Sequence, residues 1–270
     1  MSIIQFLEQE QQQAGQVWDY VSPSRLSLWL KCPLAFKRRY IDEWKTAPTP
    51  ALFVGKVVHS VLAHIYRLRI AGHVATMDEL PTFVADAWKI SMEIEPCYFD
   101  DSNEEKYRCQ VLDLATTYLN TIAIQNERPV AIEKRYEAPL IDPLSGEYFG
   151  INLVGIIDLV HEDEQGYIIT DFKTTSSSSI CEMQHELQLT AYSYLLRNII
   201  EQEELRCEIR QLVKTKTPKV NVYRFPTRID EHYERFFGLI REYLDALDRG
   251  VYNYRPSWQC SMCDHYGVCC

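Results

Sequence analysis

The sequence predicts an α+β fold in which a helical N-terminal region precedes a β-sheet that is flanked by further helices. Two features of the hydrophobic pattern support this prediction. Apolar residues recur at helical spacing through most of residues 22–127. Between residues 130 and 225, short runs rich in Ile and Val alternate with turn residues, as in β-strands. Runs of helices followed by runs of strands are typical of α+β proteins.

Helical segments are expected first along the chain. Ser22-Pro23-Ser24 has the composition of a helix start, because Pro is favoured in the first turn. Before it, residues 1–20 are expected to form a short Gln-rich helix or arm. The helices expected before the sheet occupy residues 22–40, 53–70 and most of 78–127. Two more are expected within and after the sheet, at 187–200 and 232–249.

Strands are expected in the second half of the chain, at 130–136, 153–160, 167–174, 206–214 and 220–225. Residues 162–166, which are polar and end in Gly, separate the second strand from the third. A short polar segment of this kind between two apolar runs is typical of a β-hairpin. A loop of four serines, residues 176–179, follows this hairpin.

Charge along the chain is uneven. The net charge is −10 at pH 7, which argues against a protein that binds polyanions over its whole surface. Even so, residues 209–229 contain six basic residues and no acid, and residues 25–45 form a second basic cluster. Each cluster is either an ordinary solvated face or a local site of phosphate contact. Charge in the sequence leaves both interpretations open.

Composition predicts a cytoplasmic globular protein. Hydrophobic residues make up 46% of the 270 residues, which is enough for one large domain or two small ones. No apolar run is expected to span a membrane, so we expect no membrane partner. Residues 1–15 lack the basic segment and cleavage pattern of a secretory signal.

The expected hairpin brings two carboxylates and a lysine together. Asp158 lies in an apolar run, where a carboxylate is costly unless it is paired or binds a cation. On the next strand Asp171 and Lys173 alternate with Phe172, so the two charged residues share one face. Strand pairing then places Asp158 near Asp171, and a divalent cation relieves the repulsion between them. A structural Asp–Lys ion pair is the alternative, which the second aspartate disfavours.

Five motifs follow one another along residues 22–270: Cys32-Pro, Gly55-Lys-Val-Val-His, Gly155-Ile-Ile-Asp, Asp171-Phe-Lys and Gln188-Leu-Thr-Ala-Tyr, with a cysteine-rich tail after them. Together they resemble the RecB-like PD-(D/E)XK nucleases. The cysteines resemble the iron–sulfur branch, which includes AddB-type nuclease domains and CRISPR-associated adaptation exonucleases. The resemblance implies a restriction-endonuclease-like core, in which helices flank a mixed central sheet.

This resemblance also implies a division of residues 21–270, the RecB-like nuclease domain. Residues of about 60–127 would form a helical region and about 128–230 the nuclease core. Cys32 and residues 251–270 would form an iron–sulfur region.

A metal site is the first role that the resemblance implies. His59, Asp158 and Asp171, with the backbone carbonyl of Phe172, would hold Mg²⁺ or Mn²⁺ for phosphodiester hydrolysis. Glu133 is either the upstream acidic position of the family or an ordinary surface residue.

Catalytic roles are implied for three more side chains. Lys173 would orient the attacking water and stabilise developing charge. Gln188 would position Lys173 or that water, and Tyr192 would contact the DNA backbone.

The grouped cysteines have two interpretations. Cys260, Cys263 and Cys269 are close in sequence, and Cys32 is a remote fourth thiol. Four thiolates suit zinc or an iron–sulfur cluster, and the spacing alone favours zinc. The resemblance instead implies a [4Fe–4S] cluster, in which Cys270 could substitute for Cys269.

The function expected is that of a metal-dependent DNA exonuclease acting on ends or single strands, in DNA repair, recombination or CRISPR spacer processing. Its partners would be DNA and either a helicase or a CRISPR integrase. No G-x-x-x-x-G-K-[ST] motif is present, so any unwinding would depend on a partner. The alternative is a non-catalytic DNA-binding or scaffold subunit of such a complex. The intact Asp158, Asp171 and Lys173 argue against that alternative.

Overall fold

The computed structural model describes residues 18–44, 46–100, 103–179 and 181–269, so most of the expected N-terminal arm lies outside the described residues. The α-helices are α2 (Pro23–Lys31), α3 (Pro33–Tyr40), α4 (Pro50–Ile70), α5 (Leu80–Ile94), α6 (Glu104–Thr121), α7 (Glu182–Ile200), α8 (Asp230–Asp248) and α9 (Tyr266–Cys269). Three short 3₁₀ segments are η1 (Met77–Glu79), η2 (Ile124–Asn126) and η3 (Trp258–Met262). The strands are β1 (Tyr20–Val21), β2 (Arg128–Ile141), β3 (Tyr148–Glu162), β4 (Tyr167–Thr175), β5 (Arg206–Val213) and β6 (Lys219–Pro226).

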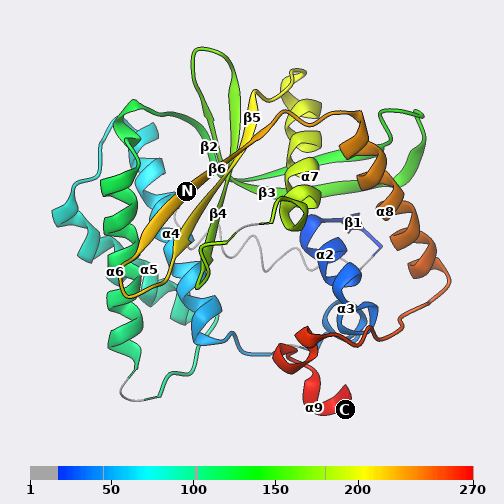
Figure 1. Ribbon diagram of the computed structural model, residues 1–270, viewed down its shortest axis with the longest axis horizontal. Helices are drawn as coiled ribbons and strands as arrows, with labels where there is room; N and C mark the ends of the chain where they lie inside the picture. The colour runs from blue at the N-terminus through cyan, green and yellow to red at the C-terminus, as the bar shows by residue number, and fades with distance from the viewer. Residues whose placement is uncertain (1–17, 45, 101–102, 180, 270) are drawn as a thin grey trace.

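The strands form one mixed six-stranded sheet, as expected for an α+β fold. Its order is β1-β3-β4-β5-β6, with β2 paired to the other edge of β3. β1 and β3 are parallel, as are β4 and β5, and the remaining pairs are antiparallel. β4 and β5 can be parallel because α7 lies between them in the sequence. The helix carries the chain back to the end of the sheet at which β4 begins. A loop joins the end of β4 to the start of α7 (Figure 1).

Along one of its edges, the long strand β3 pairs with two different strands, with a gap between them. β1 pairs with Asn152 and Leu153 near its beginning, and β4 pairs with residues 159–162 at its end. Within the described part of the chain, residues 154–158 have no backbone partner on that edge. Asp158 is the last residue of this gap, so the expected hairpin places it where the sheet opens.

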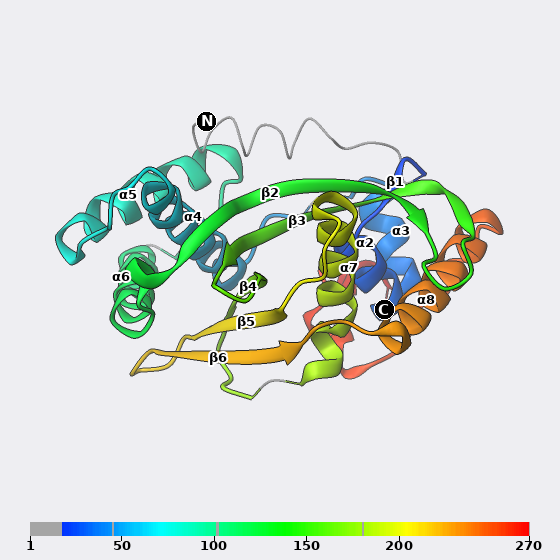
Figure 2. The same ribbon diagram turned by 90° about the horizontal axis from the view of Figure 1, so that it is seen from above.

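Helices cover the sheet in two groups, one on either side of the strands (Figures 1 and 2). Helices α4, α5 and α6 form one hydrophobic core, which includes Leu159 and Phe172 from the hairpin. Helices α2, α3, α7 and α8 form the other with the opposite residues of the strands. The hairpin that carries Asp158 and Asp171 thus lies between two cores.

The single helix expected over residues 22–40 is wrong, because the chain breaks at Cys32. That residue ends α2 and begins α3 with an extended backbone (φ −164°, ψ 108°), and Pro33 occupies the first turn of α3. Proline disfavours the helical conformation in the residue before it, so Pro33 explains the break. The Cys32 thiol consequently lies at the corner between two helices.

Helix α4 is more apolar than was expected of any segment from the sequence. By length and composition alone its 21 residues could cross a membrane. More than half of its most apolar segment is buried inside the protein. The helix is apolar because it is the centre of the α4–α6 core.

Candidate active site

Asp158 and Asp171 lie side by side where the pairing of β3 and β4 ends. The last paired residues are Leu159 and Thr170, and the next position on each strand is an aspartate. There the backbone N–H of Phe172 donates to Asp158 Oδ2 at 2.8 Å. A carboxylate therefore replaces the backbone acceptor that a continuing ladder would supply.

Lys173 is held in place by residues of β4 and α7. Its Nζ donates to Asp171 Oδ1 at 3.0 Å and to Gln188 Oε1 at 2.9 Å. The Gln188 amide nitrogen donates to the same Asp171 oxygen at 2.9 Å and to the Tyr192 hydroxyl at 2.7 Å. Gln188 and Tyr192 share a face of α7 because they are four residues apart. Helix α7 thus fixes the position of the lysine amine.

His59 approaches the aspartates from α4, on the other side of the hairpin. Its Nδ1 lies 3.5 Å from Asp158 Oδ2, and its ring meets the Phe172 ring edge-on with centroids 5.9 Å apart. One turn earlier, Gly55 lies over β4, where an added Cβ would be 3.9 Å from the Thr174 Cβ. This distance is an ordinary van der Waals contact, so α4 packs against the strand that carries Asp171.

Glu133 belongs to this site, which supports the interpretation as an upstream acidic position. Its neighbours in β2 pair with Leu159 and Ile157, so it lies beside Asp158 across the two strands. Arg67, two turns after His59 on α4, holds it with an Nη2–Oε2 distance of 2.6 Å. Glu133 has a φ of 43°, which a non-glycine residue adopts at some cost.

Three carboxyl groups, one buried and two partly buried, lie on adjacent strands and have shifted pKa values. Burial raises the pKa of Asp171 to about 6, although the charge of Lys173 opposes the shift. Burial also raises the pKa of Glu133 to about 7. Burial favours a higher pKa for Asp158 too. The charge and the hydrogen bond of His59 outweigh burial, so the pKa of Asp158 is lowered. Two of the three groups therefore take up protons close to neutral pH, and a bound cation would favour their ionised forms.

These groups fit a hard divalent cation. Asp171 Oδ2 is buried and accepts no hydrogen bond, although Lys173 Nζ lies 2.8 Å from it. Carboxylate and carbonyl oxygens suit Mg²⁺, and the His59 nitrogen adds a preference for Mn²⁺. In the described ranges, no three such side chains are already gathered around one point. His59 and Lys173 neutralise the aspartates instead, a role that a divalent cation would take over.

A buried network under Phe172 supports the hairpin, and sequence reasoning did not identify it. Arg210 is only 2% exposed, and its guanidinium donates to the Tyr66 and Tyr118 hydroxyls at 2.7 and 2.8 Å and to Glu127. Both tyrosine rings pack on Phe172. The sequence placed Arg210 in a basic cluster, and alternation along β5 groups it with the polar Arg206 and Glu208, so no sequence pattern indicated its burial.

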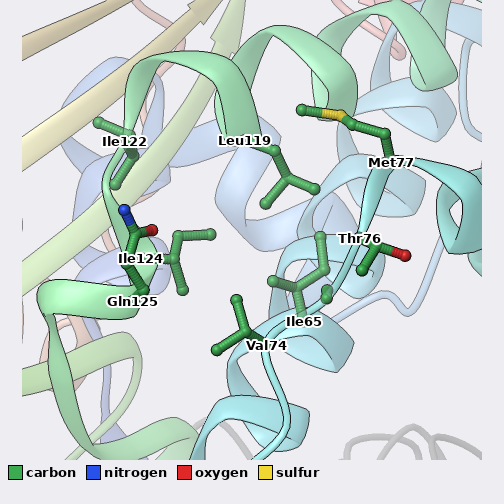
Figure 3. A pocket seen from close by; sticks show the side chains of 9 residues that line it. Ile65, Val74, Thr76, Met77, Leu119, Ile122, Ile124 and Gln125 are labelled. Carbon is green, nitrogen blue, oxygen red and sulfur yellow. The ribbon is translucent and has the colours of Figure 1, made fainter.

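An apolar cavity of about 190 Å³ lies apart from this site, between α4, α6 and the segments η1 and η2 (Figure 3). Its lining is formed by Ile65, Val74, Ala75, Thr76, Met77, Leu119, Ile122, Ile124 and Gln125. None of the catalytic candidates contributes to it.

The candidate active site itself is open to solvent, with 33% of the Lys173 side chain and 27% of the His59 side chain exposed.

The family model of the PD-(D/E)XK nuclease superfamily matches residues 20–270. The chain belongs to the PD-(D/E)XK nuclease superfamily. Among proteins with curated descriptions, none matches the sequence of this chain.

Solved structures support the fold of this superfamily member. A protein of Eubacterium rectale, provisionally described as an exonuclease, superposes with a TM-score of 0.61 at 11% identity, over 100% of this chain and 93% of that chain. The protein SSO0001 superposes with a TM-score of 0.49 at 12% identity, over 99% and 93% of the two chains. The second likeness is too weak to support a conclusion.

The position of Tyr192 in this nuclease fold conflicts with the expected contact to the DNA backbone. The residue is 6% exposed, and its hydroxyl accepts a hydrogen bond from Gln188. Its ring lies against Gly155, where an added Cβ would approach it within 3.4 Å. Tyr192 therefore holds the Gln188 side chain in place through this hydrogen bond and is not available for contact with DNA.

The cysteine-rich tail of the nuclease docks beside Cys32. Arg255 donates to the Leu30 carbonyl at 2.5 Å, and Arg38 of α3 donates to the Val268 carbonyl at 3.2 Å. Figure 1 shows η3 and α9 next to α3. Cys260 and Cys263 are partly exposed and Cys269 is exposed. Over the described residues these thiols are not gathered into a metal site, and Cys270 lies outside those residues.

Proposed function

We propose that this protein is a metal-dependent DNA exonuclease that hydrolyses phosphodiester bonds at DNA ends or in single strands. The observation behind the proposal is the convergence of Asp158, Asp171 and Lys173 at the end of one hairpin. Superfamily membership supports nuclease chemistry. The description of the Eubacterium rectale protein favours the exonuclease over the endonuclease.

The proposed metal site contains His59, Asp158, Asp171 and the carbonyl of Phe172, with Glu133 beside it. A bound Mg²⁺ or Mn²⁺ would polarise the scissile phosphate and lower the pKa of the attacking water. Helix α4 supplies the nitrogen and the hairpin supplies the oxygens. Relative movement of α4 and the hairpin would therefore weaken cation binding.

Lys173 would act as a cation near the scissile phosphate. Burial lowers the pKa of its amine, but the charges of Asp171 and Asp158 outweigh burial, so the pKa is raised. The protonated amine is therefore favoured, which suits stabilisation of developing negative charge. Gln188 orients this amine through its carbonyl oxygen.

The cysteines would hold a [4Fe–4S] cluster that ties the C-terminal tail to the corner between α2 and α3. Docking of the tail beside Cys32 supports this proposal, as does the number of thiols. Zinc is the alternative metal for four thiolates. Elemental analysis of anaerobically purified protein separates the two, because only the cluster contributes iron and acid-labile sulfide.

The biological setting would be cytoplasmic DNA repair, recombination or CRISPR spacer processing, with a helicase or an integrase as protein partner. The test of the enzymatic proposal is incubation of end-labelled single-stranded and double-stranded DNA with Mg²⁺ or Mn²⁺, alongside covalently closed circles. We expect release of short labelled products from the ends, no cleavage of circles, and no reaction with chelator. DNA that is bound but remains uncut would instead identify a scaffold subunit.

A further inference from the structure

The structure separates the six basic residues of 209–229 into three groups. Arg210 and Arg228 are 2% and 1% exposed and belong to the protein interior. Arg224 is exposed but pairs with Glu208 at 3.2 Å. The remaining three are lysines at the connection between β5 and β6: Lys214, Lys216 and Lys219.

These three lysines carry uncompensated charge. Lys216 and Lys219 are exposed, and Lys214 is partly exposed. Lys214 Nζ donates to the backbone carbonyl of Ala51 at 3.3 Å, which leaves its charge unneutralised. Across the described residues no carboxylate forms an ion pair with any of the three. In an acidic protein of net charge −10, such a group provides a local attraction for an anion.

The β5–β6 connection begins at the end of β4, the strand that carries Lys173. The backbone N–H of Lys214 donates to the carbonyl of Thr175 at 2.7 Å, only two residues after Lys173. Ala51, the other partner of Lys214, is in the first turn of α4, the helix that carries His59. Figure 1 shows that the end of β4 and the β5–β6 connection lie at the same edge of the sheet.

The distance between the lysines and the catalytic amine suits one bound strand. Lys173 pairs in register with Gln211, three residues before Lys214. At a strand rise of about 3.3 Å per residue, the separation along the sheet is about 10 Å, and it increases toward Lys216. DNA carries one phosphate per about 3.4 Å along each strand of a duplex, so a few nucleotides span this gap.

The serine loop, residues 176–179, is an uncharged segment that lies against β5 and β6. The Tyr223 hydroxyl donates to the Ser178 carbonyl at 2.8 Å, and Gln211 Nε2 donates to the Ser179 carbonyl at 3.4 Å. These bonds hold the loop against β5 and β6. No acidic residue occurs in the loop, so the loop adds no charge that would repel a phosphate backbone near Lys173.

From this arrangement we propose that Lys214, Lys216 and Lys219 form a DNA-backbone subsite that binds phosphates a few nucleotides from the scissile bond. The inference rests on the proposed nuclease function and adds to it the path of the strand outside the metal site. Contacts of this kind are independent of base sequence and strengthen as salt is lowered. They position the strand and take no part in the chemical step.

The test is the salt dependence of binding to a labelled single-stranded oligonucleotide, measured in a Lys173→Ala background that prevents cleavage. Lys216→Ala combined with Lys219→Ala should weaken binding on the order of 10-fold at low salt. The slope of log K against log salt should fall by about 0.7 for each phosphate contact removed. A fully cleaving background should show a raised KM with kcat unchanged.

The matched control is Lys89→Ala combined with Arg249→Ala, which removes the same charge from exposed positions on α5 and after α8. We expect wild-type affinity and slope for this control. Equal losses in both double variants would overturn the subsite, because the effect would then be that of net charge. An unchanged slope in the lysine variant would overturn it as well, while cleavage by the wild type left the proposed function standing. Failure of the wild type to bind DNA would overturn both.

Discussion

The hydroxyl of Tyr192 decides between two roles for this residue. The structure buries it beneath Gln188, whose amide nitrogen donates to it at 2.7 Å. Tyr192→Phe should therefore leave DNA affinity unchanged and lower kcat by about 2- to 10-fold, the effect of one lost hydrogen bond. Cleavage rates and binding isotherms of the same variant check this. A large loss of affinity with kcat intact would restore the role as a DNA contact.

His161 makes the stability of the fold depend on pH. Burial lowers the pKa of this imidazole to about 4, and the nearby Arg210 acts in the same direction. The folded protein thus favours neutral histidine, whereas an unfolded chain protonates it near pH 6.5. Stability from the neutral form is complete above pH 6.5 and is lost as pH falls towards 4, by at most about 3 kcal/mol.

A variant isolates this contribution from those of other titrating groups. In His161→Gln the free energy of unfolding should fall less steeply between pH 6.5 and 4 than in the wild type. Urea unfolding at several pH values provides the measurement. Parallel curves for the two proteins would show that His161 is not responsible.

The sequence predicted some active-site residues and not others, for a physical reason. Alternation along a strand is a local property, so the residue order alone placed Asp171 and Lys173 on one face. The partner of Glu133 could not be predicted this way. Arg67 is 66 residues away in sequence and meets Glu133 only because α4 packs beside β2.

At the scale of elements, Gly155 determines how closely α7 packs on β3. A Cβ at this position would lie 2.6 Å from Leu195 Cδ1, which is fully buried. Gly155→Ala should therefore destabilise the fold by about 1–3 kcal/mol and lower activity, because α7 also carries Gln188. Thermal or urea unfolding and cleavage assays measure the two effects.

Gly55 provides the contrasting substitution. An added Cβ there would make ordinary contact with Thr174, and alanine favours a helix over glycine by about 1 kcal/mol. Gly55→Ala should thus be neutral or stabilising. If both glycine variants were equally destabilised, close packing of α7 would not be the cause at Gly155.

Element boundaries followed from the sequence except at a few points. Helical periodicity continues from α2 into α3, which concealed the break at Cys32, although Pro33 was a local indication of it. The strands β2 and β3 are also longer than expected. Their added ends, residues 137–141 and 148–152, contain Pro139 and Gly150, which disfavour strands, and they are ordered by pairing with each other.

At the scale of the whole molecule, Cys32 connects distant parts of the chain. If it ligates a cluster with the C-terminal thiols, that cluster closes a loop of more than two hundred residues. Cys32→Ala should then bleach the brown protein, remove its iron and promote aggregation, which absorbance and iron analysis would record. Stoichiometric zinc without iron in the wild type would refute the cluster. A brown, folded variant would instead point to Cys270.

The meeting of α4 with the hairpin could not be predicted from residue patterns alone. His59 and Asp158 are far apart in the chain, and no periodicity predicts that two such residues touch. The resemblance to a family supplied that expectation, and the 3.5 Å approach of the two side chains agrees with it. For the cysteines, the resemblance implied that four thiols meet at one cluster. The structure brings the C-terminal tail next to the corner at Cys32, but among the described residues the sulfur atoms are not gathered at one point.

The most direct test of the account is DNA cleavage by Lys173→Ala, with Lys89→Ala as an exposed-lysine control. The account predicts that cleavage in Mg²⁺ or Mn²⁺ falls by at least about 100-fold. DNA affinity and unfolding temperature should stay near wild type, and Lys89→Ala should cut normally. Full cleavage by Lys173→Ala would contradict the central claim that Asp158, Asp171 and Lys173 form the active site.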